Sequence, residues 1–170
     1  MRSRIVVPIV ALTAGVALAA GTLASGQPSA PAAKARAAAA VKNKGLFAFL
    51  SGRNEVGATG EQAEGDLNGR GSFSATLDGG QLCFGLTVKN IDTPIAMHIH
   101  KGRAGKAGNV VLPLTPEPDA GDPGASSGCV DIPAALATSI FTSPGKYYVN
   151  VHTQPFAGGA VRGQLFRMPR

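Results

Sequence analysis

Apolar and polar residues alternate through most of the chain beyond residue 45, and this period of two constrains the fold more than any other feature. The alternation is clearest in QLCFGLTV (81–88), where every second residue is apolar. It recurs in GSFSATLD (71–78), IAMHIH (95–100), KYYVNVHT (146–153) and AVRGQLF (160–166), with shorter candidates at 46–50 and 109–114. Because residues two apart share one face of a strand, the pattern predicts strands and not helices.

Turn-forming residues separate the predicted strands, as in Asp78-Gly79-Gly80. Only IPAALATSIF (132–141) has a helical pattern, with Pro133 suited to a first turn. The stretch TPEPDAGDPGASSGCVD (115–131) is expected to be one long loop. The sequence therefore predicts an all-β domain, an antiparallel Greek-key-like β-sandwich or barrel of about seven or eight strands with one short helix.

The first 44 residues differ from the rest in composition. Arg2 and Arg4 precede an uncharged apolar run (5–21) that ends among small residues, which is typical of a secretory signal peptide over 1–25. An uncleaved membrane anchor is the alternative, but Pro8 interrupts the run, so membrane contact is expected only during export. Residues 26–44 are rich in alanine and proline and predict a disordered linker. The domain is expected at 45–170, secreted or at the cell envelope.

The excess of positive over negative charge lies outside the predicted domain. The net charge is +6, but six of the 16 basic residues and none of the 10 acidic residues fall in residues 1–44. The rest of the chain is therefore balanced. A nucleic-acid-binding domain would carry a basic surface of its own, so no nucleic-acid partner is expected.

Two cysteines in an exported chain predict one disulfide, Cys83–Cys129. Cys83 alternates with the apolar residues of its strand and so faces away from the core. Because Cys129 falls in the expected loop, the bridge would tie that loop to the outer face of the sheet.

The histidines fall on strand positions of one parity. His98 and His100 alternate with Ile95, Met97 and Ile99, which we assign to the core side, so both histidines are expected on the outer face. His152 has the same relation to its neighbouring valines. If residues 154–158 form a hairpin loop, Arg162 lies on that face diagonal to His152. Asn150 shares this face and is expected near the same site.

Lys101, Arg103 and Lys106 alternate with glycines in the segment that follows His100. The spacing does not match a dinucleotide-binding fingerprint, and no helix follows to bind an anion. The segment is expected to be a solvated loop.

Several of these motifs occur together in a known family. HIHKGRAGKAGNVV (98–111), YYVNVHT (147–153) and VRGQL (161–165) resemble segments of the CHRD (chordin-type) domain family, and LSGRNEV (50–56) resembles its opening segment. One departure is Ala160, which stands where the family pattern has glutamate. The resemblance covers about residues 46–167. It implies an extracellular binding or structural module without catalytic activity, whose partner would be an extracellular protein or polymer.

A weaker resemblance is to the copper site of copper/zinc superoxide dismutases, which also combines a His-x-His strand with a distant histidine. It implies His98, His100 and His152 as ligands for copper, because copper and zinc both accept imidazole. The dismutase zinc loop has no counterpart here, since the chain has three histidines in all. A copper-binding or dismutase-like protein is therefore one hypothesis. The alternative is that the histidines only hydrogen-bond loops to the sheet.

No residue is predicted to be catalytic. GASSG (124–128) matches the G-x-S-x-G motif of hydrolases, but that motif needs a strand–turn–helix elbow in an α/β sheet.

Overall fold

The computed structural model describes residues 45–78 and 80–167. The strands are β1 (Leu46–Ser51), β2 (Arg70–Asp78), β3 (Gln81–Lys89), β4 (Pro94–Lys101), β5 (Val110–Pro113), β6 (Gly124–Asp131), β7 (Tyr147–Thr153) and β8 (Val161–Gln164). The helical segments are α2 (Ala134–Thr142) and the short 3-10 turns η1 (Gly52–Asn54) and η2 (Pro144–Lys146). None of the helices in these two ranges has the length and apolar character needed to cross a membrane. The predicted signal peptide and linker lie outside the described residues.

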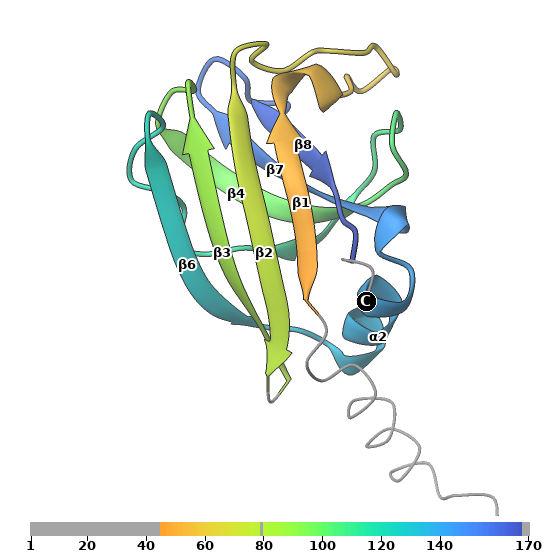
Figure 1. The fold of residues 1–170 in the computed structure, drawn as a ribbon. Coiled ribbons are helices and arrows are strands. Elements are labelled where there is room, and N and C mark those ends of the chain that lie inside the picture. The colour runs from red at the N-terminus through yellow and green to blue at the C-terminus, as the bar shows by residue number, and fades with distance from the viewer. Residues whose placement is uncertain (1–44, 79, 168–170) are drawn as a thin grey trace, which may run out of the picture.

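The strands form one curled antiparallel sheet in the order β5-β4-β7-β8-β1-β2-β3-β6. Figure 1 shows the two layers that result, with β1, β2, β3 and β6 in front of β4, β7 and β8. The sheet turns from one layer to the other where β1 meets β8, and there the pairing narrows to Ser51 opposite Arg162 and a bridge between Phe47 and Phe166. The predicted all-β class and sandwich are confirmed.

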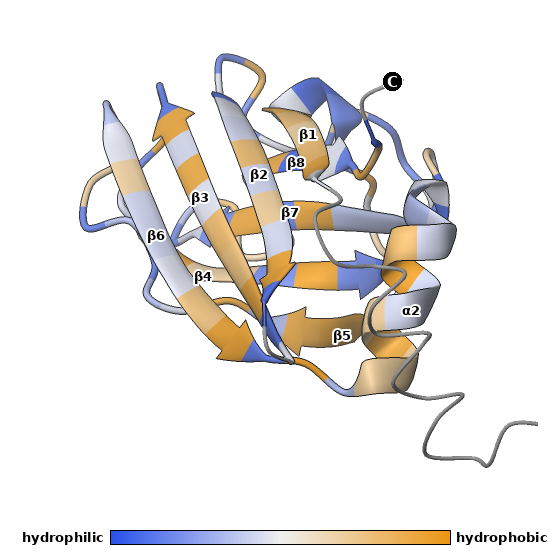
Figure 2. Cartoon of the chain, turned by 60° about the horizontal axis from the view of Figure 1, so that its bottom comes forward, coloured by the Kyte–Doolittle hydropathy of each residue, from blue (hydrophilic) through white to orange (hydrophobic). Residues whose placement is uncertain are grey.

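The core lies between the two layers and follows the predicted alternation. Leu82, Phe84, Leu86 and Val88 of β3 are all buried, and Figure 2 shows the corresponding alternation of apolar and polar residues along the strands. Burial of one such side chain stabilises the fold by about 1.5–3 kcal/mol. The predicted helix is also confirmed: α2 begins directly after Pro133 and lies at one end of the sandwich.

The prediction that residues 115–131 form one long loop was wrong, because Gly124–Asp131 form the edge strand β6. This strand pairs with β3 over eight consecutive residues, from Val88 opposite Gly124 to Gln81 opposite Asp131. Its sequence, GASSGCVD, lacks an apolar stripe, so the alternation that marked the other strands is missing. Its backbone hydrogen bonds to β3 hold it in the sheet, and they have no signature in side-chain hydropathy. The G-x-S-x-G match therefore lies in a strand.

The assignment of Ile95 to the core side was also wrong. The side chain of Ile95 is 54% exposed, whereas those of Met97 and Ile99 are 1% and 0% exposed. The register of β4 against β7 shifts between Pro94 and Ala96. An irregularity of this kind breaks the two-residue alternation at the strand end, so the parity argument holds only from Met97 onward.

The predicted disulfide between Cys83 and Cys129 is present. The two residues are direct partners on the neighbouring strands β3 and β6, with Cα atoms 4.0 Å apart. The bridge therefore joins two strands on the outer side of the sheet. It does not tie down a loop, because Cys129 belongs to β6.

Thr153, at the end of β7, provides a test of packing in the core. Its side chain is 0% exposed, and its hydroxyl has no hydrogen-bond partner among the described residues. A buried hydroxyl without a partner costs about 1–3 kcal/mol. Thr153→Val has nearly the same shape and is expected to raise the free energy of unfolding by about 1 kcal/mol, as measured by urea denaturation.

The control for this prediction is Thr76→Val on the exposed face of β2, which is expected to change stability by no more than about 0.5 kcal/mol. A loss of stability in Thr153→Val would show that the hydroxyl is hydrogen-bonded in solution.

Candidate metal centre

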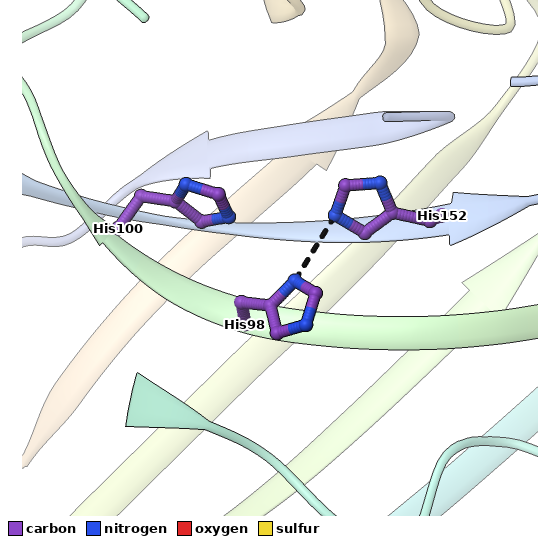
Figure 3. A group of neighbouring side chains, drawn as sticks. All are labelled: His98, His100 and His152. Carbon is purple, nitrogen blue, oxygen red and sulfur yellow. Dashed lines mark hydrogen bonds between the residues drawn. The ribbon is translucent and has the colours of Figure 1, made fainter. Parts of the chain in front are cut away.

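The three histidines come together on the outer face of β4 and β7, which are adjacent antiparallel strands. In their register Ala96 lies opposite His152, His98 opposite Asn150, and His100 opposite Tyr148. His98, His100 and His152 each offer a ring nitrogen within 4.8 Å of the others'. Figure 3 shows the three rings turned toward one another, His98 and His100 from one strand and His152 from the other.

Two backbone carbonyls determine which nitrogens are free. Nδ1 of His100 lies 2.8 Å from the carbonyl oxygen of Gly108, and Nδ1 of His152 lies 2.9 Å from that of Ala157. A carbonyl oxygen only accepts hydrogen bonds, so each Nδ1 must carry the proton. In the neutral ring the lone pair is then on Nε2. Nε2 of His100 is buried and has no hydrogen-bond partner within the described part of the chain.

His98 presents the opposite ring nitrogen. Its Nδ1 lies 3.1 Å from Nε2 of His152, the contact drawn as a dashed line in Figure 3. Two imidazoles bound to one metal ion at about 2.0–2.1 Å place their nitrogens roughly 3–4 Å apart. The 3.1 Å pair already meets this requirement. The widest separation between the three ligand nitrogens is up to 4.8 Å. It would need to shorten by about 1 Å to reach the distance between two ligands of one ion.

Burial favours the neutral form of two of the rings. It is the largest influence on His98 and His100 and lowers the pKa of each, and the neighbouring His152 lowers both further. Neutral imidazole is the form that binds a metal ion. Burial at the site therefore favours the metal-binding form of two candidate ligands.

The site is on the outer face of the sheet, as the parity of the strands predicted, but it is only partly exposed to solvent. His100 is only 8% exposed, and Asn150 and Arg162 only 1% and 2%. Residues 102–109 cover this face, and a Cβ atom at Gly108 would collide with the backbone of Lys101. The side chains of Lys101, Arg103 and Lys106 are exposed, as expected for a solvated segment. The backbone of the loop, however, lies over the site.

Arg162 contacts both the covering loop and the aromatic ring that stacks on His100. One of its NH2 groups donates to the carbonyl oxygens of Arg103 and Lys106, at 3.0 and 2.8 Å, and so holds the covering loop. Its guanidinium carbon lies 3.4 Å from the centre of the Tyr148 ring, and Tyr148 stacks on His100 with ring centres 4.8 Å apart. Arg162 is opposite Asn150 in the register, which makes it diagonal to His152 as predicted.

The model of the CHRD domain family matches residues 46–165, a range that contains every strand from β1 to β8. The chain belongs to the CHRD domain family. No curated protein and no solved structure matches the chain.

Sequence reasoning missed one charged residue of this CHRD domain. Glu55, in the segment after η1, is 3% exposed, and its carboxylate lies 4.0 Å from the Arg162 guanidinium. Burial raises the pKa of Glu55, and Arg162 opposes that rise. The CHRD domain therefore has a buried carboxylate beside Gly159, the residue before Ala160. Glu55 belongs to LSGRNEV, but its charge alone did not indicate that it would be buried.

Proposed function

We propose that this CHRD domain is an exported copper-binding module that uses His98, His100 and His152 as ligands. One observation carries the proposal. The backbone carbonyls of Gly108 and Ala157 hold the protons of His100 and His152 on Nδ1, which leaves both Nε2 lone pairs for a metal ion. Nδ1 of His98 lies 3.1 Å from one of these nitrogens, a separation that two ligands of one metal ion also adopt.

Copper is the metal that this donor set favours. Imidazole suits copper and zinc, and for a given set of ligands Cu²⁺ binds more tightly than Zn²⁺. Three protein ligands leave a coordination position for a further donor. The proposed role is capture of the ion without turnover, and superoxide dismutation is an outcome to be tested.

A structural role for the histidines is the second candidate. His100 bonds to the covering loop through Gly108, and His152 bonds to the β7–β8 hairpin through Ala157. Neither bond requires a metal ion. In this case the domain would be a non-catalytic extracellular module that binds a protein or polymer partner elsewhere on its surface.

Titration of purified, tag-free protein with Cu²⁺ and, separately, Zn²⁺ distinguishes the two candidates. The copper hypothesis expects one Cu²⁺ per chain, an electron paramagnetic resonance spectrum with nitrogen splitting, and weaker binding of Zn²⁺. Absence of stoichiometric binding would leave the histidines with a structural role. Superoxide consumption by the copper-loaded protein well above that of the free ion would add a catalytic function.

Acid is expected to release the copper only below the ordinary pKa of histidine. The pKa values of His98 and His100 are lowered, so these rings stay neutral to a lower pH than free imidazole and compete less well for protons. The pH at which half of the copper is released should therefore lie below about 6.5. Dialysis across a pH series, with copper measured by elemental analysis, checks this. Complete release already at pH 7 would contradict it.

Export predicts a shortened mature chain that begins between Ala20 and Lys44. Intact-mass measurement of protein recovered from the native host tests this prediction. A mass that retains Arg2 through Gly21 would contradict cleavage and favour a membrane anchor.

A further inference from the structure

Asn150 lies at the centre of the three histidines. On the outer face of the β4–β7 pair it is directly opposite His98, and His152 follows it two residues along the same strand. His100 is its diagonal neighbour on β4. No other side chain on this face has all three histidines as its nearest neighbours in the register.

The amide oxygen of Asn150 points into this cluster. Its Oδ1 lies 3.0 Å from Nε2 of His152. Asn150 is 1% exposed, so bulk water does not satisfy its amide. The oxygen is therefore a buried acceptor within bonding distance of a proposed metal ligand.

Glu55 explains why the oxygen, and not the NH2 group, faces the histidines. The NH2 group of Asn150 is on the opposite side, toward the Glu55 carboxylate. Both groups lie against Gly159, where a Cβ atom would collide with the Glu55 carboxylate and come within 3.0 Å of Nδ2 of Asn150. A carboxylate only accepts hydrogen bonds, so it favours the orientation in which the amide NH2 faces it.

Two acceptors therefore face each other at the centre of the site. With its proton on Nδ1, neutral His152 has a lone pair on Nε2, and that lone pair lies 3.0 Å from the lone pairs of Asn150 Oδ1. Such a contact is unfavourable unless a proton or a cation lies beside both atoms. Two donors bound to one metal ion at about 2.0–2.2 Å are separated by about 3 Å, so the spacing fits a shared ion.

We propose that the Asn150 amide oxygen is a fourth copper ligand and that the resulting set, three imidazoles and one oxygen, selects Cu²⁺ over Cu⁺. This proposal rests on the copper-binding function proposed above. Cu⁺ prefers soft sulfur ligands, whereas an amide oxygen is a hard donor. The described residues offer no sulfur ligand here, because Met97 faces the core and both cysteines are in the disulfide.

The first test removes the oxygen. Asn150→Leu has a similar size and is expected to weaken Cu²⁺ binding by about tenfold. Cu⁺ binding should change by less than about threefold, because Cu⁺ gains little from an oxygen donor. Affinities are measured by competition with chelators, Cu²⁺ in air and Cu⁺ under anaerobic reduction. Thr153→Val, on the opposite face of the same strand, is the matched control and should leave both affinities unchanged.

The second test exchanges the two partners and keeps the buried charge. In Glu55→Gln/Asn150→Asp the glutamine NH2 group can donate to the new carboxylate, so the contact is kept while the oxygen becomes anionic. Arg162 is near both positions, 4.0 Å from Glu55 and opposite residue 150 in the register. Cu²⁺ binding is expected to become at least about tenfold tighter, because a carboxylate is a stronger ligand for Cu²⁺ than an amide.

The outcomes separate this proposal from the copper-binding function. If wild type binds copper and both variants bind Cu²⁺ within about twofold of it, Asn150 is not a ligand and the three-histidine site stands. If wild type binds no copper, the proposed function itself fails. If Asn150→Leu does not fold, the exchange variant decides, since unchanged or weaker Cu²⁺ binding in the folded variant would overturn the proposal.

Discussion

Replacement of His152 by asparagine is expected to weaken Cu²⁺ binding by at least about 100-fold, because loss of even a supporting residue around a metal ligand costs about 10–100-fold in affinity. Asparagine can retain the hydrogen bond that Nδ1 of His152 makes, but not the lone pair of Nε2. Its NH2 group occupies the position of Nδ1 and can still donate to the carbonyl oxygen of Ala157, which Nδ1 contacts at 2.9 Å. It has no atom at the position of Nε2, so the lone pair beside His98 is lost.

The same design applies to His100, whose Nδ1 bond to Gly108 an asparagine can also retain. Gln154→Asn, an exposed change two residues beyond His152, is the matched control and should bind copper like wild type. Affinity is measured by chelator competition, and thermal unfolding without metal reports on the fold. Unchanged affinity in His152→Asn would exclude ligation. Unfolding of the metal-free variant would instead show that the imidazole is needed for structure.

Removal of the disulfide is expected to have the largest effect on stability. Cys83 and Cys129 are 46 residues apart, and closing a loop of that length stabilises a fold by about 4 kcal/mol if the bridge acts on the entropy of the unfolded chain. Domains of this size have a free energy of unfolding of about 5–15 kcal/mol in total. The double variant Cys83→Ser/Cys129→Ser should therefore lose a large part of its stability.

Urea denaturation of the oxidised wild type and of the double variant measures this loss. Wild type under reducing conditions is the matched control and should resemble the variant. Copper affinity of the folded variant should not change, because the bridge joins β3 and β6 while the histidines are on β4 and β7. A difference below about 1 kcal/mol would contradict the entropic estimate.

Hydropathy predicted strands wherever a strand has one buried face. β2 and β3 were predicted because their alternation records burial against the core. β6 was not, since its residues are small and polar and the backbone of β3 holds it in place. The disulfide pair was predicted, but the strands that it joins were not. Two cysteines in an exported chain imply a bridge without indicating where in the fold each cysteine lies.

The sequence by itself determined which face of its strand each histidine occupies. The alternation of side chains along an extended chain is a local property, so residues 98, 100 and 152 could be assigned to the face opposite the core. Only the tertiary structure decided that β4 and β7 are neighbours in the register that places His98 opposite Asn150. Strand pairing depends on the packing of the whole sandwich, and local side-chain patterns do not specify it. The burial of Glu55 and Arg162 and the hydrogen bonds from Arg162 to the covering loop follow from that packing, because each joins residues far apart in the chain.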